Sequence, residues 1–289
     1  MSARAQPDRG RAREKSPGLA PLRAPGEELS AKQLVEALGL WQRPHPGAGA
    51  RPYVLLNMIS SVDGRATLGG HSGPLGDSAD RALFHALRCA TDGVLAGAGT
   101  VRMERYGLLV RDQSCMDLRR GRGLPEQPLA CIVSGRLALE EDIPLLADPD
   151  ARVVVMTPSE ARLPGGSAQI DYVRPRRGGL LDLPAALEEL RARFGVQLLL
   201  CEGGPHLGAQ LFAENLVDEL FLSVAPLLAG GEPMAGEAVR IVAGAELDPP
   251  VALELLGALT GGSTLFLRYG VSARARVSRE TTLSSSLAR

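Results

Sequence analysis

Short apolar runs alternate with stretches of helical periodicity from Pro52 to Tyr269, and this alternation constrains the fold more than any other feature. Runs this short are typical of strands that are buried on both faces. They occupy residues 53–59, 93–96, 129–133, 152–156, 169–173, 196–201 and 220–225. Strands that alternate with helices predict an α/β protein, in which helices cover both faces of a mostly parallel central sheet.

Two stretches between the runs have the pattern of helices. Asp77 or Ser78 can cap the first, which places one set of side chains on an apolar face and a second set on a polar face. The apolar set is Ala79, Leu83, Leu87 and Ala90, and the polar set is Arg81, His85 and Arg88. The second predicted helix covers residues 183–194. Runs 251–259 and 264–269 flank a Thr-Gly-Gly-Ser segment and predict a C-terminal antiparallel hairpin.

The 289 residues, 45% of them hydrophobic, fit one domain with tails. We place this domain at residues 51–270. Residues 1–50 are expected to comprise a disordered tail, a short helix that begins with a Ser30 to Gln33 capping box, and a proline-rich connector. Residues 271–289, rich in Ser, Thr and Arg, predict a second disordered tail.

Charge and cysteine content narrow the class of function. Lys and Arg total 32 against 33 for Asp and Glu, which gives no electrostatic signature of a nucleic-acid or membrane partner, so a small-molecule substrate is expected. No secretory signal or membrane-spanning stretch is visible. The four cysteines form no C-x-x-C pair and predict reduced, largely buried thiols rather than disulfides. We therefore expect a cytoplasmic protein without a metal site.

Three strand-to-helix junctions carry residues that suit ligand binding, because ligands of α/β sheets bind beyond the carboxyl ends of strands. They are residues 60–64, 97–100 and 202–205. At the third, Gly203 and Gly204 allow close approach of a ligand to the backbone, and Pro205 favours the first helical turn, as a diphosphate site would require. Purely structural interpretations stay open: glycine turns without a ligand, Asp63 as a turn residue, and Arg88 as a solvated helix residue.

Taken together, the motifs resemble the reductase domain of bacterial bifunctional riboflavin-biosynthesis deaminase-reductases. They are NMISSVDGRA at 57–66, ADR at 79–81, LR at 87–88, VLAGAGTVR at 94–102, EGGP at 202–205 and LVDEL at 216–220. The resemblance implies a dihydrofolate-reductase-like domain that uses NADPH to reduce 5-amino-6-(5-phosphoribosylamino)uracil. The H-x-E and P-C-x-x-C segments of the fused deaminase do not precede Arg51, so only the reductive step is expected.

The resemblance also implies roles for individual residues. Asp63 and Glu202 are the implied catalytic residues. The implied substrate contacts are Ser72, Arg88, Leu108, Arg111 and Glu202. The implied cofactor contacts are Ile59, Pro74, Gly97, Thr100, Glu104, Ser134, Gly203, Gly204, Pro205, His206 and Leu207. The sequence departs from the family pattern at Asn57, His206 and Glu104, where lysine, threonine and aspartate are common.

Further expectations accompany this interpretation. Arg102 or Arg136 could pair with a 2′-phosphate, which predicts a preference for NADPH. The edge of the terminal hairpin predicts a homodimer. Replacing Arg88 by alanine is expected to weaken substrate use but to leave stability nearly unchanged, because a residue on a polar helix face contributes little to the core.

Two alternatives remain. The first is a reductase of the same fold that acts on a dihydropterin or dihydrofolate, for which Asp80 is the one carboxylate in the first turn of its helix able to bind a pteridine. The second is a non-catalytic nucleotide-binding protein.

Overall fold

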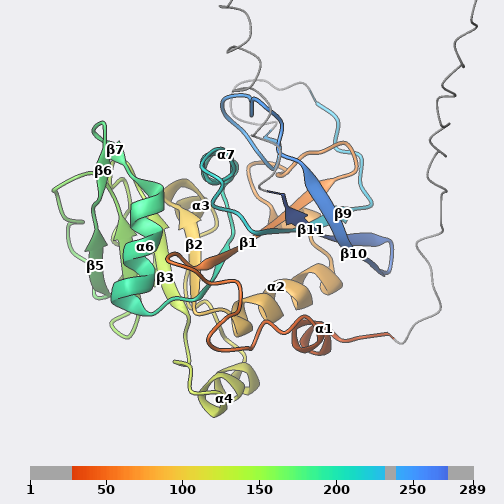
Figure 1. The fold of residues 1–289 in the computed structure, drawn as a ribbon, viewed down its shortest axis with the longest axis horizontal. Coiled ribbons are helices and arrows are strands. Elements are labelled where there is room, and N and C mark those ends of the chain that lie inside the picture. The colour runs from red at the N-terminus through yellow and green to blue at the C-terminus, as the bar shows by residue number, and fades with distance from the viewer. Residues whose placement is uncertain (1–27, 232–238, 273–289) are drawn as a thin grey trace, which may run out of the picture.

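A nine-stranded sheet forms the centre of the molecule (Figure 1). The computed structural model describes residues 28–231 and 239–272. The strand order is β10-β11-β9-β1-β8-β2-β3-β4-β5, and the strands from β9 to β5 run parallel. Their bounds are β1 Tyr53–Ser61, β2 Gly93–Gly97, β3 Leu129–Val133, β4 Arg152–Met156, β5 Gln169–Val173, β8 Leu198–Cys201, β9 Glu219–Ala225, β10 Leu253–Gly261 and β11 Thr264–Val271. The predicted mixed, mostly parallel sheet is confirmed.

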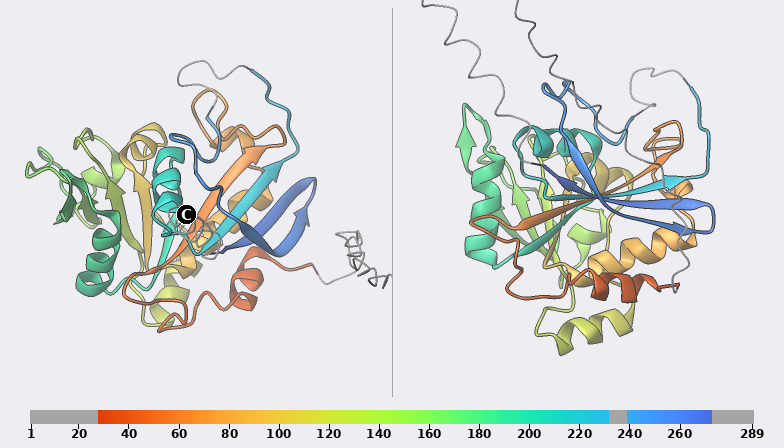
Figure 2. Two further views of the ribbon diagram at one scale, coloured as in Figure 1. Left: turned by 45° about the horizontal axis from the view of Figure 1, so that its top comes forward. Right: turned by 45° about the vertical axis from the view of Figure 1, so that its right-hand side comes forward.

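Side chains alternate between the two faces of the sheet, and each face has its own helices (Figures 1 and 2). On one face, Leu55 and Leu198 pack in a buried cluster with Leu87 of α2 (Ser78–Ala90). On the other, Leu56 and Leu199 pack in a second cluster with residues of α6 (Leu183–Phe194) and α7 (Pro205–Ala213). The prediction of helices on both faces is therefore correct. α1 (Ala31–Ala37) packs on α2.

Local capping explains where these helices begin. The Ser30 hydroxyl accepts from the Gln33 amide and the Gln33 side chain accepts from the Ser30 amide, so the predicted capping box is present. The Asp77 carboxylate accepts from the Asp80 amide at the start of α2. Asp182 caps α6 in the same manner, and Gly195 ends it with a left-handed φ of 71°.

Several short elements were not predicted. They are α3 (Ala98–Met103), α4 (Gln113–Gly121), α5 (Pro144–Ala147), a 3-10 turn at Gly73–Leu75 and a small ribbon of β6 (Arg176–Arg177) and β7 (Leu180–Leu181). α4 carries five polar or charged side chains among its nine residues, which leaves few apolar positions to reveal a helical period. The other elements are too short for periodicity to distinguish them from loops.

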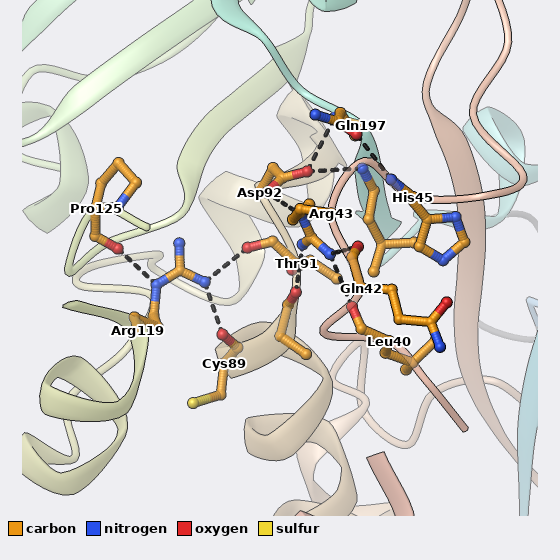
Figure 3. A network of polar contacts seen from close by, with 12 residues as sticks. Leu40, Gln42, Arg43, His45, Cys89, Thr91, Asp92, Arg119, Pro125 and Gln197 are labelled. Atoms are coloured by element: carbon orange, nitrogen blue, oxygen red, sulfur yellow. Dashed lines mark hydrogen bonds and ion pairs between the residues drawn. The ribbon is translucent and has the colours of Figure 1, made fainter. Parts of the chain in front are cut away.

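A buried polar network joins the amino-terminal ends of the central strands (Figure 3). The Asp92 carboxylate accepts from Arg43 Nε at 2.9 Å and from the Leu198 amide at 2.8 Å. Arg119 is fully buried and donates to the carbonyl oxygens of Cys89 and Thr91 at 2.7 and 2.6 Å. Burial lowers the pKa of the Arg119 guanidinium to about 10. These contacts attach the connector and α4 to the end of the sheet opposite the strand-to-helix junctions.

One expectation about the cysteines was wrong. Cys89 of α2 and Cys115 of α4 form a disulfide, with their Cα atoms 5.9 Å apart. Their separation of 26 residues gave no motif, because folding alone brings the two helices together. Cys131 and Cys201 are free and buried, as expected, and burial raises the pKa of the Cys201 thiol to about 12.

The C-terminal hairpin forms the edge of the sheet. β10 pairs with β11 in antiparallel register, with an irregularity between Leu255 and Gly257. β11 extends to Val271, one residue into the segment predicted to be a tail. Residues 1–27 and 273–289, which make up most of the two predicted tails, lie outside the described residues. Among the described segments, no helix has the length and apolar character needed to cross a bilayer.

Candidate functional site

The three strands that carry the predicted junctions are neighbours in the sheet. β8 lies between β1 and β2 and pairs in parallel with both, so the carboxyl ends of all three lie at one edge. The junctions therefore meet in space, although more than a hundred residues of sequence separate the second from the third. This is the place where an α/β sheet binds ligands.

Two of the junctions are in direct contact. The Gly97 amide donates to the Gly203 carbonyl at 2.8 Å. A Cβ atom at Gly204 would lie 2.7 Å from Thr100 Oγ1, so this approach requires a glycine. Gly203 has a φ of 88°, which also favours glycine. The glycines predicted to contact a ligand thus serve first to bring the start of α3 and the start of α7 together.

A pocket of about 850 Å³ opens beside these junctions, within the range of small-molecule sites. Residues at positions i, i+4 and i+8 of α2 share its lining, namely Asp80, Phe84 and Arg88. The structure brings eight of the predicted site residues into the lining: Ile59, Ser72, Arg88, Thr100, Glu104, Leu108, Arg111 and Glu202. Asn57, which departs from the family pattern, also lines the pocket.

The most buried charges in the pocket form one ion pair. Arg88 Nε and Nη2 donate to the two Glu202 oxygens at 2.6 and 2.7 Å, and these side chains are 11% and 3% exposed. Arg88 also stacks on Phe84, with its guanidinium carbon 4.2 Å from the ring centroid. The interpretation of Arg88 as a solvated residue on a polar helix face is wrong. The helical periodicity placed Arg88 on the polar face of α2, but Glu202, the residue that follows β8, is its buried partner.

Tyr106 completes this cluster and was not predicted. Its hydroxyl donates to Glu202 Oε2 at 2.5 Å. Burial, and then the charge of Glu202, raises the pKa of the Tyr106 phenol well above its ordinary value. Tyr106 falls in the segment after the Thr100 motif, where the resemblance is weakest, so only its aromatic character could have drawn attention to it.

A second contact between predicted residues also lies in the lining of the pocket. Glu104 Oε1 accepts from the Ser72 amide at 2.9 Å and from the Ser72 hydroxyl at 3.1 Å. This contact joins the loop after β1 to the end of α3. Leu108 and Arg111 are exposed residues of the segment between α3 and α4, which places them at the rim of the pocket. Ser72, Glu104, Leu108 and Arg111 are thus all at one pocket, but their roles toward a ligand stay proposals.

Other predicted cofactor contacts lie along the edge of the sheet, outside the set of described residues that line the pocket. Ser134 is buried at the end of β3, and its amide donates to the Met156 carbonyl. The residues at the start of α7 range from buried to exposed: Leu207 is buried and His206 is exposed. Pro74 lies in the exposed 3-10 turn. The remaining members of this group are Gly97, Gly203, Gly204 and Pro205.

The structure does not bring Asp63 into the pocket. Its carboxylate accepts from the Ser61 hydroxyl at 2.5 Å and from the amides of Ala229 and Gly230 at 3.1 and 2.6 Å. These hydrogen bonds, that of Ser61 foremost, lower the pKa of Asp63 to about 2. The contacts agree with the interpretation of Asp63 as a turn residue, and a strongly acidic carboxyl group is poorly suited to donate a proton at neutral pH.

We expect Arg88→Ala to be strongly destabilising, in contrast to the expectation from sequence. Removing the guanidinium leaves Glu202 buried without its counter-ion, which costs roughly 3–5 kcal/mol. Urea denaturation would measure the loss. Arg81→Ala is the control, because Arg81 is exposed and donates to the Gly76 carbonyl. An equal, small loss in both variants would contradict the structural assignment.

Asp63 predicts an acid-dependent loss of stability. Because its folded-state pKa lies below the unfolded value, its contribution is present above about pH 4 and is lost as the pH falls toward 2. Thermal midpoints measured across this range should fall less steeply for Asp63→Asn than for the parent chain. Asp150→Asn, at an exposed turn, should follow the parent chain. Identical slopes for all three proteins would show that the Asp63 contacts contribute nothing.

Comparison with known proteins places this arrangement in a family. Over 187 residues the chain is 30% identical to the 2,5-diamino-6-ribosylamino-4(3H)-pyrimidinone 5′-phosphate reductase of Archaeoglobus fulgidus. The matched region covers 63% of this chain and 83% of the relative. The enzyme of the same name from Methanothermobacter thermautotrophicus is 26% identical, over 76% of this chain and 99% of its own.

A solved structure has the same fold. The pyrimidine reductase-like protein of Corynebacterium diphtheriae superimposes with a TM-score of 0.64 at 22% identity, over 84% of this chain and 99% of that one. The model of the RibD C-terminal domain matches residues 52–267, which include every strand of the central sheet except the last residues of β11. The chain belongs to the RibD C-terminal domain family.

Proposed function

We propose that the protein is a reductase of the riboflavin pathway that transfers hydride from NADPH to the sugar of a phosphoribosylaminopyrimidine. The expectation from the sequence motifs is 5-amino-6-(5-phosphoribosylamino)uracil as substrate. The archaeal relatives are named for the 2,5-diaminopyrimidinone equivalent. The observation that carries the proposal is the pocket beside the glycine junctions, in which Arg88 and Glu202 form a buried pair and Arg111 lies at the rim.

The residues of the pocket have different roles in the binding of substrate. Arg111 is suited to the 5′-phosphate, because a guanidinium binds phosphate through two parallel hydrogen bonds. Both oxygens of Glu202 accept hydrogen bonds from Arg88 and Tyr106, but a carboxylate has about four acceptor sites and can also bind a sugar hydroxyl. Arg88 and Tyr106 would thus orient Glu202 toward the reacting sugar.

The residues along the sheet edge fit a dinucleotide. Gly203, Gly204 and the first turn of α7 offer backbone amides for a diphosphate. Thr100, in the first turn of α3, lies beside Gly204, and Ser134 follows β3 at the same edge of the sheet. NADPH, when bound there, supplies the hydride. Arg102 donates to the Ala138 carbonyl, which leaves the exposed Arg136, beside Ser134, as the better candidate for the 2′-phosphate.

Purified protein should oxidise NADPH when a phosphoribosylaminopyrimidine is supplied, measured as loss of reduced-nicotinamide absorbance. NADPH should be preferred over NADH, and Arg136→Ala should reduce this preference roughly tenfold, since a charged hydrogen bond is lost. Arg120→Ala, an exposed arginine on α4 paired with Asp117, should leave the preference unchanged. Equal efficiency with both cofactors in the parent chain would refute the cofactor assignment.

One observation favours the alternative of a dihydropterin or dihydrofolate substrate. Asp80, the carboxylate that a pteridine would require, does line the pocket. A pterin carries no phosphate, so Arg111→Ala should spare a pterin reductase and impair a sugar-phosphate reductase. The non-catalytic alternative predicts tight NADPH binding without turnover of either class of substrate.

We also propose a homodimer formed through the terminal hairpin. β10 is an edge strand, and its exposed leucines, Leu253, Leu255, Leu256 and Leu259, are 42–52% accessible. The expected cytoplasmic location remains a prediction.

Light scattering at micromolar protein should report two copies, and Leu255→Lys should shift the protein toward monomer because it places a charge on the apolar edge. Leu180→Lys is the control, since Leu180 is 73% exposed on β7, which belongs to a separate two-stranded ribbon and not to the sheet that contains β10. A parent chain that scatters as a monomer would overturn the proposal.

A further inference from the structure

The disulfide between Cys89 and Cys115 lies in the lining of the pocket. Both cysteines contribute to this lining, and they are 2% and 4% exposed. Cys89 directly follows Arg88 in α2, and Cys115, in the first turn of α4, lies four residues after Arg111. The cross-link therefore connects the helix that carries Arg88 to the segment that carries Arg111, the residue proposed to bind the phosphate.

The rim of the pocket packs directly on this disulfide. Val110 is buried in one small cluster with both cysteines. The carbonyl of the preceding residue, Leu109, accepts from Arg88 Nη1 at 3.2 Å. The side chain of Gln127 holds the backbone of Val110, since its Oε1 accepts from the amide at 3.0 Å and its Nε2 donates to the carbonyl at 2.7 Å. The chain is thus fixed up to the residue before Arg111.

The two ends of α4 are attached with different strength. Near its end, the fully buried Arg119 donates to two carbonyl oxygens at the end of α2, at 2.7 and 2.6 Å. At its start, the disulfide is accompanied by the ion pair of Lys32 with Asp112, in which both side chains are 57% exposed. Ion pairs as exposed as this one contribute little to stability. Reduction of the disulfide would therefore release mainly the start of α4, next to Arg111.

Reduction must also move the two sulfur atoms apart. They are about 2.0 Å apart in a disulfide, whereas atoms that are not bonded come no closer than about 3.5 Å. The Arg88–Glu202 pair and the packing of Leu87 on the sheet hold α2, so the start of α4 takes up most of the movement. A displacement of about 1 Å in a group that positions substrate can lower the rate about a hundredfold. Arg111 is the pocket residue that this movement affects most.

We propose that the Cys89–Cys115 disulfide is a site of thiol–disulfide exchange that small dithiols reach through the pocket, and that its reduction weakens the binding of phosphorylated substrate. The effect on substrate rests on the proposed function, whereas the exchange site does not. In the proposed cytoplasmic location, thiols are kept reduced, and disulfides found there are mostly redox-active.

The exchange is balanced by the dithiol that supplies its electrons. A thiolate of the dithiol attacks one cysteine sulfur, and the S–S bond breaks as a mixed disulfide forms. The other cysteine leaves as a thiolate and takes up a proton. The second thiol of the reagent then closes the disulfide of the reagent and releases the first cysteine, which is protonated in turn. The protein gains two electrons and two protons, and the dithiol is oxidised to a cyclic disulfide.

A thiol count tests the exchange site without any turnover. The folded full chain, purified in air, would be incubated with dithiothreitol, freed of it and titrated with a chromogenic thiol reagent after denaturation. Two thiols are expected before treatment, from the free Cys131 and Cys201, and all four cysteines should titrate after it. A phosphoribosylaminopyrimidine, added without NADPH, should slow the reduction because it fills the route to the sulfur atoms.

Steady-state kinetics test the effect on substrate. Reduction should raise the KM for the phosphoribosylaminopyrimidine roughly tenfold, because a charged hydrogen bond from Arg111 is weakened. The KM for NADPH should stay unchanged, and neither KM depends on how much of the enzyme is folded. Cys115→Ser should behave like the reduced parent chain, with or without dithiothreitol. Cys131→Ala is the matched control: it removes a buried cysteine outside the disulfide and should respond to dithiothreitol as the parent chain does.

Each outcome decides one part of the inference. Four thiols before treatment, or only two after it, would reject the exchange site, and equal rates of reduction with and without substrate would reject access through the pocket. An unchanged KM for substrate after reduction, or an equal rise in the KM for NADPH, would reject the effect on substrate binding. If Cys115→Ser does not fold, the parent chain before and after dithiothreitol decides. Turnover of no phosphoribosylaminopyrimidine would reject the proposed function together with the effect on substrate, and the thiol count alone would then decide the exchange site.

Discussion

The parallel pairing of β8 with β1 on one side and β2 on the other is the constraint on which the site depends. Parallel strands end at one edge, so pairing alone brings together segments that follow Ser61, Gly97 and Cys201. Asp92 supports this arrangement from the opposite end, because its carboxylate accepts from the backbone at the start of β8 and from Arg43 of the connector. The pocket is consequently built on rigid strands, although loops provide much of its lining.

Arg88 and Glu202 show that one contact can serve folding and function together. The pair is almost completely removed from water, so each charge is tolerated only because the other is present. A loss of activity after mutation of either residue would therefore not distinguish chemistry from stability. Measurements of substrate ratios, as opposed to absolute rates, avoid this difficulty at neighbouring positions of the pocket.

Sequence predicted the elements with a strong local signal. The apolar runs at β3, β4 and β5 and the capped helix α6 have the predicted bounds, because apolar patterning and capping act within a few residues. The eight predicted residues that meet at the pocket came from the family resemblance, whereas Tyr106, the disulfide and α4 did not come from any local pattern. Each of these three features depends on residues that only the completed fold brings together. Tyr106, for example, donates to Glu202, which is itself buried against Arg88.

The charge of the pocket depends on the ion pairs that its cations form. Arg88 is neutralised by Glu202, Lys32 forms an ion pair with Asp112, and Arg105 forms one with Asp142. Three of the cations that line the pocket are thus already paired, and Arg111 takes part in none of the ion pairs among the described residues. Asp80 adds a carboxylate to the same lining, so the pocket offers groups for both an anion and N–H donors.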